Sequence, residues 1–297
     1  METAASRAGG VPTSRVKPES QLGMTVTRLL RIQGAVIGLL AIGIMVVVAL
    51  LAPMVAPYDP IEPSPSEAFS SPSPRHLMGT DYIGRDILSQ LVYGARISLR
   101  TGVLSVLIGL VLGSVIGLIS GFYAGMVDAV IMRLMDMMLA FPGMILALSI
   151  VSVLGPSLTN VLLAVGLAMV PLFARLVRGS VLSEKEKVYI EAARAIGSSS
   201  WRIAFRHILP NVVAPILVMG TLNIGRAIIA GAALSFLGLG AQPPTPEWGA
   251  MLAGGRSYLR DAWWMSTFPG LAIFATVLAI NMVGDGLRDA LDPRLRV

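Results

Sequence analysis

Residues 101–127 read TGVLSVLIGLVLGSVIGLISGFYAGMV, a run of 27 positions without a charged side chain. A helix needs about 20 mostly apolar residues to cross the hydrocarbon core of a bilayer, so this run predicts a membrane-spanning helix. Glycine recurs at every fourth position, which leaves one helix stripe without side chains, at Gly109, Gly113, Gly117, Gly121 and Gly125. Such a stripe is typical of close packing in a helix bundle or at a subunit interface, and a direct substrate role is the weaker alternative.

Further apolar stretches complete a six-span pattern. Residues 32–58 and 262–284 carry no charge, and residues 208–237 are interrupted only by Arg226. Residues 137–174 are uncharged over 38 positions but contain the turn-forming sequence GPSLTN, which predicts a helical hairpin of two spans. We therefore expect an all-α integral membrane protein with six transmembrane helices.

The composition excludes an ordinary soluble enzyme. Hydrophobic residues make up 55% of the 297 residues and charged residues only 13%, whereas a soluble domain carries about 25% charge. The absence of cysteine excludes disulfides, iron–sulfur clusters and thiolate metal sites. The net charge of +6 would suggest nucleic acid as the partner of a soluble protein, but it is also typical of basic cytoplasmic loops in a membrane protein.

The distribution of basic residues predicts the orientation. Of the 23 Lys and Arg residues, 16 fall on the face that holds both termini, 6 fall on the opposite face, and Arg226 lies within a span. Cytoplasmic loops carry the excess of positive charge, so both termini are expected in the cytoplasm. The first apolar run is longer than the core of a signal peptide, which favours an uncleaved span.

The same runs divide the chain into segments. The predicted segments are a cytoplasmic tail at 1–30, a first transmembrane helix at 31–58, an extracytoplasmic loop at 59–100, a domain of five transmembrane helices at 101–290 and a cytoplasmic tail at 291–297. The first tail has the low hydrophobicity of a disordered segment. Residues 85–100 could form a helix that leads into the second span.

The loop predicted between the fourth and fifth spans, residues 183–211, is the most informative stretch outside the membrane. The sequence up to residue 196 favours a helix, Gly197 stops it, and Ser200 can cap a second short helix. In this second helix one stripe is basic, at Arg202 and Arg206, and another is apolar, at Trp201, Ala204, Phe205 and Ile208. Two helices at a glycine elbow would make a rigid knob, which either rests on anionic headgroups or docks into a partner protein.

Arg226 lies near the middle of the fifth span, where an unpaired charge is costly. Two interpretations stay open: Arg226 lines a polar pathway, or the helix tilts so that the side chain reaches an interface. No chain of intramembrane acids or histidines accompanies it, so a stand-alone secondary transporter or channel is poorly supported. An intramembrane enzyme lacks a nucleophile and base at matching depth.

Several motifs together resemble one family of transport proteins. Glu191, Ala192 and Ala193, followed by Gly197 and closed by Ile208-Leu209-Pro210, are similar to the EAA loop of ABC-importer permeases. The segments GTDYIGRD at 79–86, YGARISL at 93–99, SFLGLGAQPPTPEWG at 235–249 and GDGLRDALDP at 284–293 are similar to the DppC/OppC-type subunit of dipeptide and oligopeptide permeases. The resemblance extends from about Arg28 to the C-terminus.

This resemblance implies a fold and a set of partners. The fold would be that of a type I ABC importer (MetI-like) permease, with residues 31–58 as the OppC N-terminal region. The partners would be a second, DppB/OppB-like permease, two DppD/DppF-like subunits that bind ATP and magnesium, and an extracytoplasmic peptide-binding protein. The chain itself would be a non-catalytic permease of a bacterial inner membrane, without cofactor or metal. Its cargo would be a di- or oligopeptide, with glutathione or a nickel chelate as alternatives.

The resemblance also implies roles for particular residues. Coupling to the ATPase would involve the EAA loop, at Glu191, Ala192, Ala193, Gly197, Trp201, Phe205, Leu209 and Pro210. Contact with the binding protein would involve Asp81, Arg85, Gln242, Glu247 and Trp248. A phosphate-binding loop of the GxxxxGK[ST] type is excluded, because none of the three lysines follows a glycine.

Overall fold

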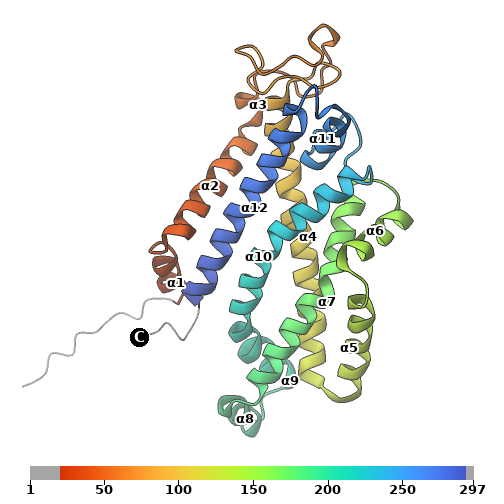
Figure 1. Ribbon diagram of the computed structural model, residues 1–297. Helices are drawn as coiled ribbons and strands as arrows, with labels where there is room; N and C mark the ends of the chain where they lie inside the picture. Colours follow the sequence, from red (N-terminus) through yellow and green to blue (C-terminus); the bar gives the residue numbers. More distant parts are fainter. Residues whose placement is uncertain (1–20, 292–297) are drawn as a thin grey trace, which may run out of the picture.

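The computed structural model describes residues 21–291, which fold into helices and connecting loops and contain no β-strand. The helices are α1 (Gln21–Leu29), α2 (Gln33–Leu50), α3 (Ala52–Val55), η1 (Pro65–Glu67), α4 (Ile87–Tyr123), α5 (Gly125–Leu139), α6 (Gly143–Leu154), α7 (Leu158–Lys185), α8 (Val188–Ala195), α9 (Ser200–Arg202), η2 (Ile203–Ile208), α10 (Leu209–Phe236), α11 (Trp248–Gly255), η3 (Arg256–Tyr258) and α12 (Trp264–Leu291). Helices α2, α4, α7, α10 and α12 run between the two ends of the bundle (Figure 1).

Five helices among the described residues are long and apolar enough to cross a membrane, and the pair α5 and α6 makes a sixth span if it is counted as one. The two halves of this pair meet at 89°. The break falls at Pro142, because proline has no backbone N–H to donate and disfavours helical geometry in the preceding residue. The expected all-α membrane architecture is confirmed, with one bent span.

The position of the third span differs from the prediction. Its first half begins at Gly125, so the residues taken for an inner loop between the second and third spans, Asp128 to Asp136, lie in helix α5. Two arginines assigned to the next cytoplasmic loop, Arg175 and Arg178, lie in α7. Arg178 pairs with Asp128 and Arg175 with Asp136, both at 2.5 Å, so the charges are satisfied between the two helices. Treating charged residues as loop markers failed for these four residues, because each of them pairs with a residue of the facing helix.

The predicted segment ends also change. Residues 21–29 form α1, which corrects the expectation of disorder for that part of the tail, whereas residues 1–20 lie outside the described residues. Helix α12 continues to Leu291, and residues 292–297 lie outside the described residues as well. The predicted loop 59–100 ends at Asp86, whose carboxylate accepts the Ser89 N–H at 2.7 Å and caps a helix of 37 residues.

Helices α4 and α7 pack backbone to backbone along the glycine stripe. A Cβ on Gly113 would lie 2.6 Å from the Phe173 Cβ, and one on Gly121 would lie 2.9 Å from the Val181 Cβ. Gly109 and Gly117 face α7 in the same way, whereas Gly125 has no atom within 4 Å of such a Cβ and instead starts α5. Four of the five glycines therefore serve close packing within this chain, and the fifth serves a turn.

We expect Gly113→Ala to lower the free energy of unfolding by about 1–3 kcal/mol, because the added methyl group has no space between two backbones. The matched control is Gly43→Ala in α2, where nothing lies within 4 Å of a Cβ. Thermal unfolding of the purified chain in detergent measures both variants. Equal melting temperatures for the two would contradict tight α4–α7 packing.

The two ends of the bundle are built differently (Figure 1). One end carries α1, the last turn of α12 and the short helices α8 and α9. The opposite end carries the loop between α3 and α4, the loop after α10 and helix α11. The two ends of the described chain therefore lie on the same side, as an even number of spans requires.

Candidate functional site

The loop at 183–211 folds into a helix, a glycine elbow and a second helix, here called the knob (residues 186–208). Helix α8 ends in a Schellman motif: the Gly197 N–H donates to the Arg194 carbonyl at 2.9 Å and the Ser198 N–H to the Ala193 carbonyl at 3.0 Å. This motif needs a left-handed residue, and Gly197 has a φ of +78°. The chain then turns back, and the Ser199 side chain, rather than that of Ser200, caps the next helix by accepting the Arg202 N–H.

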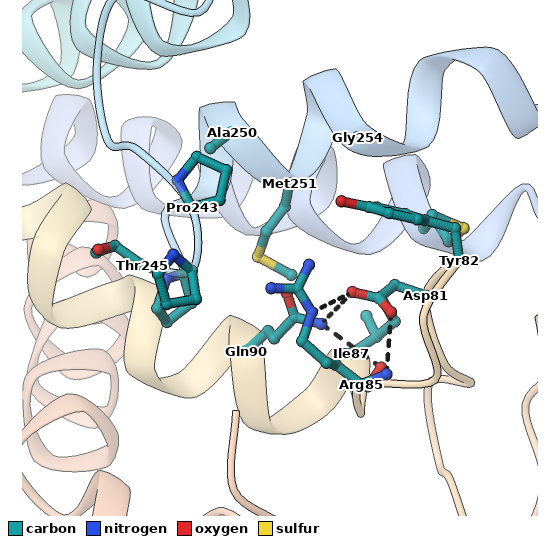
Figure 2. Close-up of a pocket in the computed structure, with 13 residues that line it drawn as sticks. Asp81, Tyr82, Arg85, Ile87, Gln90, Pro243, Thr245, Ala250, Met251 and Gly254 are labelled. Carbon is teal, nitrogen blue, oxygen red and sulfur yellow. Dashed lines mark hydrogen bonds and ion pairs between the residues drawn. The ribbon is translucent and has the colours of Figure 1, made fainter. Parts of the chain in front are cut away.

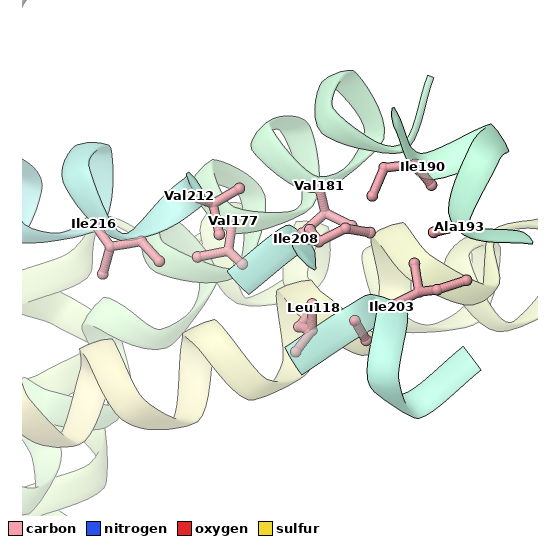
Figure 3. Close-up of a cluster of buried hydrophobic side chains, with 10 residues drawn as sticks. Leu118, Val177, Val181, Ile190, Ala193, Ile203, Ile208, Val212 and Ile216 are labelled. Atoms are coloured by element: carbon pink, nitrogen blue, oxygen red, sulfur yellow. The ribbon is translucent and has the colours of Figure 1, made fainter. Parts of the chain in front are cut away.

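The knob rests on an apolar base that joins it to the spans (Figure 3). Ile190 and Ala193 of α8 belong to the same buried cluster as Ile203 and Ile208 of the second helix. The other members come from the long helices and are Leu118, Val177, Val181, Val212 and Ile216, together with Ala204. Because Ile190 and Ile208 are fully buried, the knob cannot shift without moving the helix ends beneath it.

A polar network closes the side of the knob. The Tyr189 hydroxyl donates to a Glu184 carboxylate oxygen and accepts from Asn211 Nδ2 at 3.0 Å, and Lys187 Nζ lies 2.6 Å from the other Glu184 oxygen. Burial and the neighbouring Glu184 carboxylate raise the pKa of Tyr189 to about 12. The hydroxyl therefore stays protonated at neutral pH and remains a donor. The network ties the end of α7, the start of α8 and the first turn of α10 together.

The second helix of the knob differs from the expected amphipathic helix. The predicted apolar stripe splits, since Ala204 and Ile208 are buried whereas Trp201 and Phe205 are exposed. The cause is a π-helical turn over residues 203–208, in which hydrogen bonds reach one residue further than in an α-helix. No break separates this turn from α10, so one helix runs from Ser200 to Phe236 over 37 residues.

The knob exposes several large apolar side chains among charged ones. Ile196 is 83% exposed and Trp201 is 72% exposed, and the Trp201 ring stacks on Phe205 with centroids 4.0 Å apart. Among the other residues expected to couple, Glu191, Ala192, Gly197 and Pro210 are exposed, Leu209 is half-buried and Ala193 is buried in the base. Exposed apolar side chains grouped on a rigid element are typical of a docking surface.

At the opposite end, three residues expected to contact a binding protein are buried inside the chain. Asp81 is 3% exposed, Glu247 is 3% exposed and Trp248 is 2% exposed. Glu247 caps α11 by accepting the Ala250 N–H, and Trp248 Nε1 donates to the Leu91 carbonyl at 3.0 Å. Within this chain these side chains hold the loops together, and their contact with a partner stays a prediction.

The other two residues, Arg85 and Gln242, differ in exposure. Gln242 is exposed, and its amide donates to the Gly238 and Gly240 carbonyls. The Arg85 side chain is 12% exposed and borders a pocket between the two outer loops (Figure 2). The sequence motif thus marked the correct loops but did not distinguish the exposed residues from the buried ones.

Arg226 lies on the free face of α10. Its neighbours turn the other way: a Cβ on Gly225 would face Val277 of α12, and Ile228 reaches Gly102 of α4. Arg226 is exposed, and no ion pair or side-chain hydrogen bond reaches it from residues 21–291. Within the described chain, the charge therefore faces outward without a partner.

The helical bundle with its exposed knob defines a polytopic membrane protein of the class that includes transporter permease subunits. The chain belongs to the family of binding-protein-dependent transport system inner membrane components, whose family model matches residues 113–297. A second model, for the N-terminal transmembrane domain of oligopeptide transport permease C, matches residues 20–72. The chain is accordingly a multi-pass inner membrane protein, and the DppC/OppC-type resemblance is confirmed.

Curated relatives and one solved structure agree with this membership. The chain is 48% identical over 270 residues, 89% of each chain, to the di/tripeptide transport system permease protein DppC of Pseudomonas aeruginosa. It is 50% identical over 254 residues, 85% of this chain and 84% of the relative, to the glutathione transport system permease protein GsiD of Escherichia coli O157:H7. A solved structure of the MetNI methionine ABC transporter in inward-facing conformations matches 69% of this chain and 98% of that chain, with a TM-score of 0.57 and 19% identity. That likeness confirms the MetI-like fold.

Proposed function

We propose that this chain is one of the two permeases of an ATP-driven importer of small peptides. Its partners are a second, DppB/OppB-like permease, two DppD/DppF-like subunits that bind ATP and magnesium, and an extracytoplasmic peptide-binding protein. The observation that carries the proposal is the knob. It exposes large apolar side chains, rests on a buried base and continues into a membrane-crossing helix without a break. Peptide cargo is supported by the relatives named as di/tripeptide and dipeptide permeases, each 48% identical.

Coupling in this proposal is mechanical. Closure of the ATPase pair displaces the knob, and the continuous helix from Ser200 to Phe236 transmits the movement into the membrane. The buried base and the Glu184–Tyr189–Asn211 network keep the knob from turning on its own. Alternating access follows when α10 moves against its neighbours. No bond is formed or broken in this chain, and ATP hydrolysis takes place in the partners.

The proposal fixes the orientation and the segments. The knob end is cytoplasmic, together with both termini, and the end with α11 faces outward. The segments predicted from the sequence are kept, with shifted boundaries. They are a first transmembrane region that forms the OppC N-terminal part, an outer loop up to Asp86, and an ABC-importer domain that contains the coupling loop at 183–211. Protease or labelling accessibility of Trp201 and of Arg75 on the two sides of sealed vesicles tests the orientation.

A first experiment tests the whole assignment. The tagged chain is purified from its own membranes in mild detergent, its companions are identified, and the complex is reconstituted with the binding protein. We expect ATP-dependent uptake of a radiolabelled dipeptide. A chain that arrives alone and still moves substrate without ATP would contradict the proposal.

Glutathione is the second candidate cargo, because relatives named as glutathione permeases are 50% identical over 254 residues. A nickel chelate is a third alternative. Uptake of labelled dipeptide, labelled glutathione and a labelled nickel chelate, measured side by side at low concentration, discriminates the three, since only the true cargo accumulates.

We infer that Arg226 lines the path of the cargo, because an unpaired guanidinium in a spanning helix requires a polar surrounding. We expect Arg226→Gln to raise the KM for dipeptide uptake about tenfold to a hundredfold, in line with loss of a hydrogen bond to a charged group. Arg226→Lys should lie between this variant and the wild type. The control is Arg133→Gln in α5, which removes the same charge at another exposed site. An unchanged KM for Arg226→Gln would indicate that Arg226 reaches an interface instead.

A further inference from the structure

The two loops of the outer end line an open pocket of about 70 Å³, here called the outer pocket. The loop before α4, the first turn of α4, the loop after α10 and helix α11 all contribute to it (Figure 2). Ile87 and Met265, each 2% exposed, are the most buried residues of its lining.

Arg85 supplies the charge of the outer pocket. Its Nε donates to Asp81 Oδ2 at 2.6 Å, and among the described residues no hydrogen bond reaches either of its Nη groups. Figure 2 shows the guanidinium turned toward Met251. A guanidinium has five N–H donors in a planar fork, so most of its donors remain free for a ligand.

Asp81 does not need Arg85 as its sole partner. It also accepts the backbone N–H groups of Ile83 and Arg85 and the Gln90 amide, at 2.9–3.1 Å. The Asp81 carboxylate thus orients the Arg85 guanidinium, and the other three donors orient the Asp81 carboxylate. A charged group that is shielded from water, oriented and left with free donors is a preorganised binding group.

We infer that the outer pocket receives the carboxylate of an aspartate or glutamate side chain of the extracytoplasmic binding protein. The free fork of Arg85 matches a carboxylate in charge and geometry. The rim consists of the exposed Tyr82, Pro243, Pro244 and Thr245, which can enclose the stem of such a side chain. This inference rests on the proposed function, because it names the contact by which the binding protein is held.

The test uses the complete transporter in nanodiscs and its peptide-loaded binding protein as the probe. We expect Arg85→Gln to raise the Kd of the binding protein about 30-fold or more, as for a desolvated charge pair at an interface. Uptake at saturating binding protein should change less than twofold, and Arg85→Lys should be intermediate. The matched control is Arg75→Gln, an exposed arginine of the same loop, which should change the Kd less than threefold.

A double-mutant cycle identifies the partner group. Each surface carboxylate of the binding protein is replaced in turn by its amide and combined with Arg85→Gln, and for the true partner the double variant should bind about as weakly as either single variant. Additive losses for every carboxylate would overturn the inference. So would an unchanged Kd in Arg85→Gln together with a lower unfolding temperature, which would mean that Arg85 only neutralises Asp81. If the wild-type transporter neither binds this protein nor takes up peptide, the proposed function itself fails.

Discussion

The Gly197→Val variant is expected to lose at least about tenfold in coupled uptake, because a side chain in the left-handed region costs about 1–2 kcal/mol or more. Gly197 has a φ of +78° and completes the Schellman motif that ends α8. Nothing lies within 4 Å of a Cβ at this position, so within the chain the cost arises from the backbone alone. Relief requires the elbow to open, which moves α8 away from its base and displaces the exposed surface that docks the ATPase.

Parallel assays of uptake and ATP hydrolysis in proteoliposomes check this prediction. Uptake should fall more than hydrolysis, since the ATPase subunits remain intact. Gly197→Asn is the matched control, because asparagine tolerates the left-handed conformation. Gly179→Val controls for side-chain volume at an exposed glycine that has no neighbour within 4 Å and no positive φ. Transport by the Gly197→Val variant at the wild-type rate would count against a coupling role for the elbow.

The sequence predicted the architecture correctly wherever a single local pattern, such as an uncharged run or a glycine repeat, determined the structure. Uncharged runs identified the long helices, and the four-residue glycine repeat identified the helix that packs most closely on a neighbour. The elbow at Gly197 followed from local chemistry, because a helix-forming stretch that meets glycine has few other ways to end. These features are determined by residues close together in the sequence, so the sequence alone can predict them.

The remaining features depend on partners distant in the sequence. Asp128 and Arg178 look like loop residues until α5 and α7 are seen side by side. Trp248 was expected to contact the binding protein, but its indole N–H donates to the carbonyl of Leu91, 157 positions away. The π-helical turn that separates Trp201 and Phe205 from the buried stripe changes the helix period, which a pattern with a fixed repeat does not reveal.

The Asp128→Asn variant is expected to destabilise the bundle by about 2–4 kcal/mol, because it leaves a partly shielded arginine without its counter-charge. Both Arg178 nitrogens that reach Asp128 lie at 2.5 Å, and Ser120 also donates to this carboxylate. The Asp128 side chain is 15% exposed and that of Arg178 is 34% exposed, so solvent screens the pair only in part. The paired residues belong to α5 and α7, and Ser120 adds α4 to the same contact.

A second pair between the same helices supplies the matched control. Arg175 and Asp136 are about half exposed, at 53% and 48%, and lie 2.5 Å apart. Removing this pair with Asp136→Asn should cost less than about 1 kcal/mol, as is usual for an exposed ion pair. Thermal unfolding of the purified chain measures both variants, and the exchange Asp128→Arg with Arg178→Asp should recover part of the loss. If both asparagine variants lower the unfolding temperature equally, burial does not determine the strength of these two ion pairs. If Asp128→Asn alone is unstable, the contact anchors the bent span to the helix that ends at the knob.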